Sequence, residues 1–221
     1  PDGELRTEEG LEARARAMLD DERAIDGVKS FFRQWLDLDR MGTLSKSEEM
    51  FPEFDGEVAT NLRASIEAFI EHVYWEGDGR LDTLLLGSFM FVNEDLAEIY
   101  GIDGVSGDAF QRVEVDASER RGLLTHPGLM ALYAKDDSSD PIHRGLFVRT
   151  RLLCQELPDP PNDVDLVIPP PQPGQSTRER FAEHTANPRC AQCHQLVDPI
   201  GFGFENYDAI GRFRTMDNGV E

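Results

Sequence analysis

The chain of 221 residues lacks several features that would define a common class of protein. It contains no G-x-S-x-G, P-loop or H-E-x-x-H motif, which argues against a serine hydrolase, a P-loop nucleotide-binding protein and a zincin-type protease. Its longest apolar run, residues 84–92, is interrupted by Gly87 and Ser88, so no segment is expected to span a membrane. Basic residues are scarce, with 22 lysines and arginines against 43 acidic residues.

The resulting net charge of −21 restricts the possible partners. Nucleic acids and anionic membrane surfaces would be repelled, whereas a protein with a basic docking surface, a metal oxide or a cationic small molecule would be attracted. An acidic surface can also serve only to keep a secreted protein soluble. The apolar fraction of 39% and the 13 phenylalanines still predict a globular core.

Cysteine is also scarce, and two of the three cysteines fall in one short motif, Cys190-Ala191-Gln192-Cys193-His194. C-x-x-C-H is the attachment sequence of a c-type haem. Two thiols at this spacing can add to the vinyl groups of one porphyrin, and the adjacent imidazole can then bind the iron. We therefore expect one covalently attached haem c, with His194 as the proximal iron ligand.

Other interpretations of the two cysteines remain open. A dithiol redox site usually lies on a βαβ pattern, and no such pattern surrounds position 190. A structural zinc needs four ligands, and the third cysteine, Cys154, lies far upstream on an apolar helical pattern. A chance match is the last alternative. Cys154 is expected to be a buried free thiol, with an inter-domain disulfide as the alternative.

The hydrophobic periodicity predicts a mainly α-helical protein. Helices are expected over residues 8–38 with a break near 20–21, and over 55–75, 81–86, 93–100, 127–134, 143–155 and 177–185. A further helical turn at the haem peptide should end at Asp198-Pro199. Residues 110–115 alternate apolar and polar side chains, which predicts one short strand.

A proline-rich stretch separates two regions of different character. Because consecutive prolines favour an extended strap over a packed element, we expect a helical region over residues 1–156, a linker over 157–175 and a small cytochrome c-like haem segment over 176–221. The haem segment is expected to be incomplete at its C-terminal end.

Aromatic residues alternate with glycines after the haem peptide. Phe202, Phe204 and Tyr207 could shield a porphyrin from water, because glycine lets the backbone approach a flat ring closely. An ordinary aromatic core is the alternative interpretation of the same residues.

The sixth iron ligand would determine the reduction potential. His184, six residues before Cys190, is the first candidate, although a histidine at a helix C-terminus can instead cap carbonyl groups. Met130, Met216 and His143 are the other candidates.

Several sequence segments resemble the cytochrome c-like modular proteins of planctomycetes and myxobacteria, which consist of consecutive domains of unknown function. The matching segments are residues 31–36 (FFRQWL), 91–97 (FVNEDLA), 100–102, 121–125 (RGLLT), 141–145 (PIHRG), 152–154, His184 and, most specifically, 190–214. The resemblance implies a haem-containing bacterial protein of the periplasm, cell surface or cell envelope. It further implies a place in a larger multi-module or multi-subunit assembly.

Three functions are compatible with these observations. The first is an electron-transfer module with one six-coordinate haem c, acting with redox partner proteins. The second is a haem-dependent redox enzyme or part of one, in which the haem is either an open iron site or an electron conduit to a neighbouring module. His143, Arg144, Arg149 and Arg151 are the candidate polar groups near an open iron site. The third is a structural or assembly subunit with an accessory haem. Electron transfer is the main hypothesis, and no catalytic residue is assigned.

Overall fold

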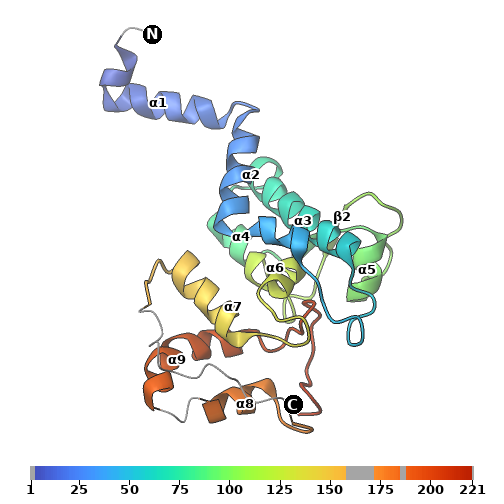
Figure 1. The fold of residues 1–221 in the computed structure, drawn as a ribbon. Helices are drawn as coiled ribbons and strands as arrows, with labels where there is room; N and C mark the ends of the chain where they lie inside the picture. Colours follow the sequence, from blue (N-terminus) through green and yellow to red (C-terminus); the bar gives the residue numbers. More distant parts are fainter. Residues whose placement is uncertain (1–2, 158–171, 185–187, 221) are drawn as a thin grey trace. The chain divides into compact units, whose positions relative to one another are not determined.

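The computed structural model describes residues 3–157, 172–184 and 188–220, and it confirms the predicted mainly helical fold (Figure 1). The chain divides into two compact units, Pro1–Asp39 and Arg40–Glu221. Residues 158–171 of the predicted linker lie outside the described part of the chain, so the division at residues 157–175 stays a prediction.

The first unit contains a 3₁₀ turn (η1, Glu4–Arg6) and two helices, α1 (Glu8–Leu19) and α2 (Ala24–Trp35). The break predicted near residues 20–21 is confirmed. The Thr7 side chain accepts a hydrogen bond from the Gly10 N–H and so caps α1.

The 3₁₀ segment η2 (Leu38–Thr43) spans the boundary between the two units. The second unit is built around α3 (Gly56–Glu71), which continues as a π-helical turn, η3 (His72–Glu76). The Asp55 side chain accepts from the N–H groups of Glu57 and Val58 and caps α3. The apolar stripe predicted for this helix is confirmed, since each of its members is buried: Val58, Leu62, Ile66, Phe69, Ile70 and Val73.

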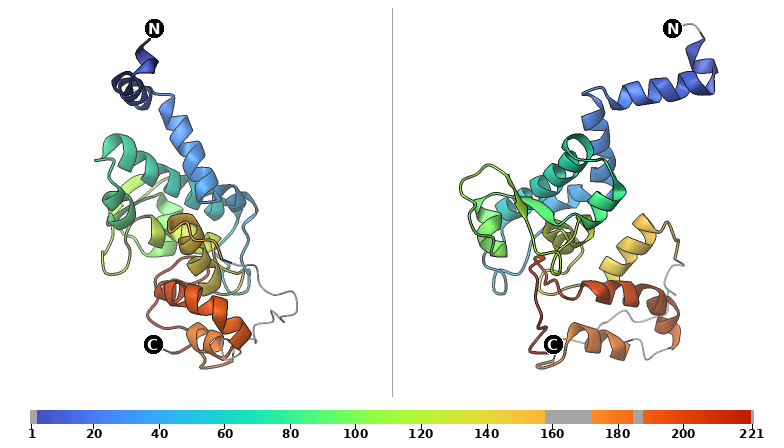
Figure 2. Two further views of the ribbon diagram at one scale, coloured as in Figure 1. Left: turned by 90° about the vertical axis from the view of Figure 1, so that its left-hand side faces the viewer. Right: turned by 180° about the vertical axis from the view of Figure 1, so that it is seen from behind.

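A two-stranded antiparallel sheet lies beside α3 (Figure 2). The predicted strand forms as β2 (Gln111–Glu114), paired with β1 (Phe89–Val92), which the sequence did not predict. Strand β1 falls within the apolar run 84–92, and a run without alternation cannot be distinguished from a buried helix by periodicity. The rings of Phe69 and Phe89 pack at 5.0 Å between α3 and β1.

Three short helices and a 3₁₀ turn complete this part of the unit: α4 (Leu81–Leu86), α5 (Glu94–Tyr100), η4 (Leu123–Thr125) and α6 (Pro127–Leu132). The predicted ends of α5 are confirmed, since Asn93 caps its N-terminus and Gly101 follows it in the left-handed conformation. The chain then continues as α7 (Pro141–Phe147) and a π-helical turn, η5 (Val148–Leu152).

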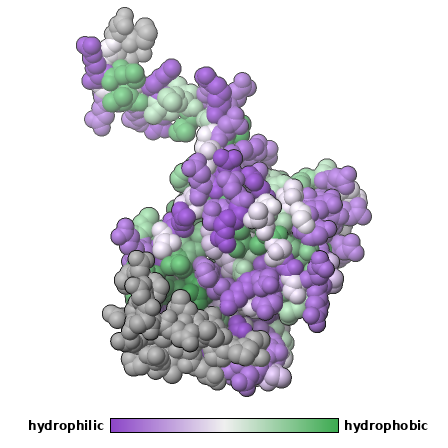
Figure 3. Space-filling model, in the orientation of Figure 1, coloured by the Kyte–Doolittle hydropathy of each residue, from purple (hydrophilic) through white to green (hydrophobic). Residues whose placement is uncertain are grey.

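The C-terminal part of the second unit contains α8 (Thr177–His184), α9 (Pro188–Gly201) and a 3₁₀ turn, η6 (Phe202–Phe204). Helix α9 packs along α7 (Figures 1 and 2). On the visible face of this unit, hydrophilic residues predominate among those that are coloured (Figure 3). Among the described residues, every helix is too short or too polar to cross a lipid bilayer.

Candidate functional site

The C-x-x-C-H motif lies on helix α9. The helix places positions 190 and 193 about one turn apart, with His194 directly after the second cysteine. Cys193 is a half-buried free thiol, whereas the side chain of Cys190 lies outside the described part of the structure.

The predicted end of this helix at Asp198-Pro199 is wrong, because α9 continues to Gly201. Pro199 lies inside the helix and has no N–H to donate to the carbonyl four residues earlier, so α9 continues past it without that hydrogen bond. Because α9 continues past position 198, Asp198 lies four residues after His194 on the same helix, which brings the two side chains together.

The Nδ1 atom of His194 lies 2.9 Å from one carboxylate oxygen of Asp198 and 3.2 Å from the other. Both side chains are largely buried, with exposed fractions of 18% and 8%. A buried carboxylate that accepts from Nδ1 fixes the tautomer and the orientation of the ring, and it directs Nε2 toward a metal. Nε2 is therefore the nitrogen of His194 that would bind iron.

Two glycines allow α7 and α9 to approach closely. A Cβ atom at Gly145 would overlap the Val197 carbonyl, and one at Gly201 would overlap the carbonyl of Pro141. In addition, the Arg149 side chain donates to the Leu196 carbonyl across this interface at 2.5 Å. Because backbone atoms meet backbone atoms here, α9 has little freedom to shift along α7.

Arg144 of α7 connects this helix to the segment after the haem motif. Its fully buried guanidinium donates to the carbonyls of Phe204, Tyr207 and Asp208 at 2.7–2.9 Å and to the Met130 carbonyl at 3.0 Å. Burial lowers the pKa of Arg144 to about 10, so the group remains charged at neutral pH. Nη1 and Nη2 of Arg144 serve these carbonyls, and the role of Arg144 as a polar group at an open iron site stays a prediction.

The three aromatic residues predicted to shield a porphyrin occupy different surroundings. Phe202 and Phe204 are half-buried in η6, and the Arg178 guanidinium lies over the Phe202 ring at 5.3 Å. Tyr207 is buried, donates from its hydroxyl to the Glu119 carbonyl and packs against the Phe213 ring. Their contact with a haem stays a prediction.

The candidates for the sixth ligand are spread over the second unit. His184 ends α8, and its side chain lies outside the described part. Met130 is buried in α6, while Met216 is half exposed and lines the same cavity of about 290 Å³ as Phe202. His143 is 65% exposed, and its Nδ1 lies 2.7 Å from the Asp140 carboxylate, which raises the pKa of the imidazole.

Cys154 is a free thiol but not a buried one, which corrects the prediction of burial. Leu153 beside it, also expected on the buried stripe, is half exposed. The π-helical turn η5 precedes both residues and contains an extra residue per turn. Positions after such a turn leave the α-helical stripe from which burial was predicted.

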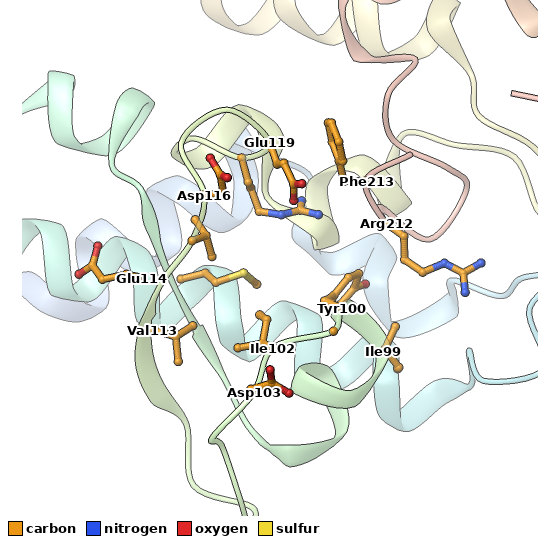
Figure 4. Close-up of a pocket in the computed structure, with 14 residues that line it drawn as sticks. Ile99, Tyr100, Ile102, Asp103, Val113, Glu114, Asp116, Glu119, Arg212 and Phe213 are labelled. Atoms are coloured by element: carbon orange, nitrogen blue, oxygen red, sulfur yellow. The ribbon is translucent and has the colours of Figure 1, made fainter. Parts of the chain in front are cut away.

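A separate cavity of about 790 Å³ lies beside α5 and β2 (Figure 4). Carboxylates of Asp103, Glu114, Asp116 and Glu119 surround it, and Tyr100 lines it with its hydroxyl bonded to the Ile210 carbonyl at 2.7 Å. Its lining contains none of the residues predicted to bind haem. Among the described residues, no group of three or more histidine, cysteine or acidic side chains is arranged to hold a metal ion.

The fold and the site define a mainly helical, modular protein whose C-terminal part presents a C-x-x-C-H motif on a packed helix. Residues 1–102 match the family PSD4, a protein of unknown function (DUF1592), and residues 120–217 match the family PSCyt3, a protein of unknown function (DUF1588). The chain thus consists of two consecutive domains of these types, which confirms the predicted modular architecture. No curated protein and no solved structure gives a significant match.

Sequence reasoning missed two residues of this region. Asp198 would have been found if the helix had been extended by one turn, because position i+4 from His194 is a carboxylate. Arg180 of α8 is buried beside the fully buried Phe181. Its neighbours in the sequence did not indicate this burial, since the residues around it come from distant parts of the chain.

Proposed function

We propose that the chain is a c-type cytochrome module that transfers single electrons in the bacterial cell envelope. One haem c would be attached through Cys190 and Cys193, with Nε2 of His194 as the proximal ligand. The observation that carries this proposal is the contact between His194 Nδ1 and the buried Asp198 carboxylate, which is a typical arrangement for a metal-binding histidine.

The residues of α9 fit a covalently held haem. Positions 190 and 193 are about one helical turn apart, and His194 is half-buried on the same helix. The bound haem would supply the one-electron chemistry. The chain itself holds the helix by close packing against α7, orients the imidazole through Asp198 and restricts access of water to both side chains.

We propose His184 as the sixth iron ligand, with Met130, Met216 and His143 as the alternatives. The net charge of −21 favours redox partners with a basic docking surface. Arg144 supports electron transfer over catalysis at iron, because its Nη1 and Nη2 atoms donate to the backbone after the motif and to the Met130 carbonyl.

Covalent attachment is tested by producing the chain with a c-type haem maturation system. Haem should remain with the denatured protein after extraction with acidic acetone, and C190A/C193A should lose it. C154A is the matched control, since it removes an exposed thiol outside the motif and should retain the haem. A chain that releases all of its haem would contradict the proposal.

The optical spectrum then tests the coordination of the iron. A reduced protein with a sharp α-band that does not change when carbon monoxide is added would support a six-coordinate electron-transfer haem. Rapid binding of carbon monoxide would instead indicate an open site and favour a redox enzyme.

A further inference from the structure

Arg180 is a buried arginine with two unused donors. It lies on α8 and is only 6% exposed. Its Nε and Nη2 atoms are both buried and have no hydrogen-bond partner among the described residues. A buried guanidinium without an acceptor is unfavourable, because burial removes the water that would otherwise accept its hydrogen bonds.

The two unused atoms form one edge of the guanidinium. The N–H groups of Nε and Nη2 point in parallel, and this edge binds the two oxygens of a carboxylate. The same chain shows the arrangement at the surface, where Nε and Nη2 of Arg23 bind the two oxygens of Asp21 at 2.7 and 2.6 Å. In Arg180 the corresponding edge is buried, and no carboxylate of the described residues binds it.

Arg180 lines a cavity of about 420 Å³, and two of the three aspartates in its lining are already paired with other arginines. Asp208 lies 2.8 Å from Arg212, and Asp217 lies 2.8 Å from Arg214. Asp217 also accepts from the backbone N–H of Thr177 at 2.6 Å, directly before the helical turn that carries Arg180. These carboxylates are therefore held away from the open edge of the guanidinium.

The charges around the cavity favour a ligand with a single negative charge. Three arginines (Arg180, Arg212, Arg214) and three aspartates (Asp137, Asp208, Asp217) line it. Because Arg212 and Arg214 are each paired with an aspartate, the cation left for a ligand is that of Arg180, and its single charge matches a carboxylate better than a phosphate dianion.

We propose that Arg180 binds a carboxylate through its Nε and Nη2 atoms. In the haem-bearing protein this carboxylate would be a haem propionate, and this assignment of the source rests on the proposed function. Arg180 lies ten positions before Cys190 in the predicted haem segment, and a propionate there would give the guanidinium its missing acceptors. The other source of the same chemistry is a free carboxylate ligand.

The first arm of the test uses the full haem-bearing chain, with carbon-13 in the propionate carboxyl groups. Redox-difference infrared spectra should show that the labelled carboxylate bands shift in R180Q and in R180K, the second of which keeps the charge but loses the parallel donors. R16Q is the control, because it removes the same charge from an exposed arginine on α1, outside the predicted haem segment, and should leave the bands unchanged.

The second arm titrates acetate into the full chain and follows the backbone NMR signals of α8. If the ligand is a free carboxylate, acetate should bind saturably to the unaltered chain and to R16Q, and at least about tenfold more weakly to R180K. The proposal is overturned if the labelled bands are the same in all variants and acetate leaves α8 unchanged. A preparation without haem refutes the proposed function, and the acetate titration alone then decides the role of Arg180.

Discussion

Asp198 accepts a hydrogen bond from His194 across one turn of α9, with 2.9 Å between Nδ1 and the nearer carboxylate oxygen. Val197, the residue before Asp198, is buried where α9 meets Gly145 of α7. The orientation of the imidazole therefore depends on the packing of α9 as well as on the motif itself.

Replacing Asp198 should change the electronic properties of the haem site. A carboxylate on Nδ1 makes the imidazole a stronger donor and favours the oxidised iron, so D198N should raise the reduction potential. Potentiometry followed by optical spectroscopy measures this change. D108N removes the same charge from an exposed loop, at a residue that does not line the Arg180 cavity, and should leave the potential close to that of the unaltered protein. Equal effects of both variants would show that only net charge matters.

The packing of α7 on α9 should be sensitive to one added methyl group. G201A would place a Cβ atom against the Pro141 carbonyl, which cannot move without shifting α7, so we expect a loss of about 1–3 kcal/mol in the free energy of unfolding. G203A is the control, because a Cβ atom there meets no neighbour within 4 Å. Urea unfolding should show a change within about 0.5 kcal/mol for G203A. Similar costs for the two variants would contradict the close contact at Gly201.

Acidification should destabilise the fold through His126. This histidine is 2% exposed, and burial, together with the nearby Arg120 cation, lowers its pKa from 6.5 to about 3. The Gly128 N–H donates to its Nδ1, so the folded protein holds the neutral ring. Because the unfolded chain binds a proton below about pH 6.5, the free energy of unfolding should fall by up to about 1.4 kcal/mol per pH unit between about pH 6.5 and about pH 3.

Urea unfolding at ~pH 7 and ~pH 5 measures the contribution of His126 to this slope. H126Q should reduce the loss of stability on acidification, whereas H72Q should keep it, since His72 lies beside Glu76 in a less buried position. The same slope in H126Q and the unaltered protein would refute the assignment. If H126Q does not fold, hydrogen exchange of the unaltered protein at the two pH values reports the same change in stability.

The net charge should control the rate of electron exchange. With −21 charges, oxidation by a cationic complex such as hexaammineruthenium(III) should slow as salt is added. Oxidation by an anionic complex such as ferricyanide should become faster under the same conditions. Stopped-flow measurements at several ionic strengths compare the two reagents, and salt effects of the same sign would contradict an acidic surface near the haem.

Much of the fold followed from local patterns in the sequence. The helices α1, α2, α3 and α5 begin and end close to the predicted residues, because their caps and apolar stripes are properties of neighbouring positions. Strand β1 was missed because its apolar residues do not alternate, and the burial of Cys154 was mispredicted because a π-helical turn changes the helical period. Both predictions failed at positions where the spacing of apolar residues along the chain does not indicate which side chains face the core.

The sequence by itself determined the helical class, the acidic charge and the position of the C-x-x-C-H motif, since these depend on composition and on residues adjacent in the chain. Only the tertiary structure showed what surrounds the motif. Arg144 donates hydrogen bonds to carbonyls more than sixty positions away, and Arg180 lines one cavity together with Asp208 and Arg212. Such contacts depend on how the chain folds back on itself, and a buried charge has no signature in the residues next to it.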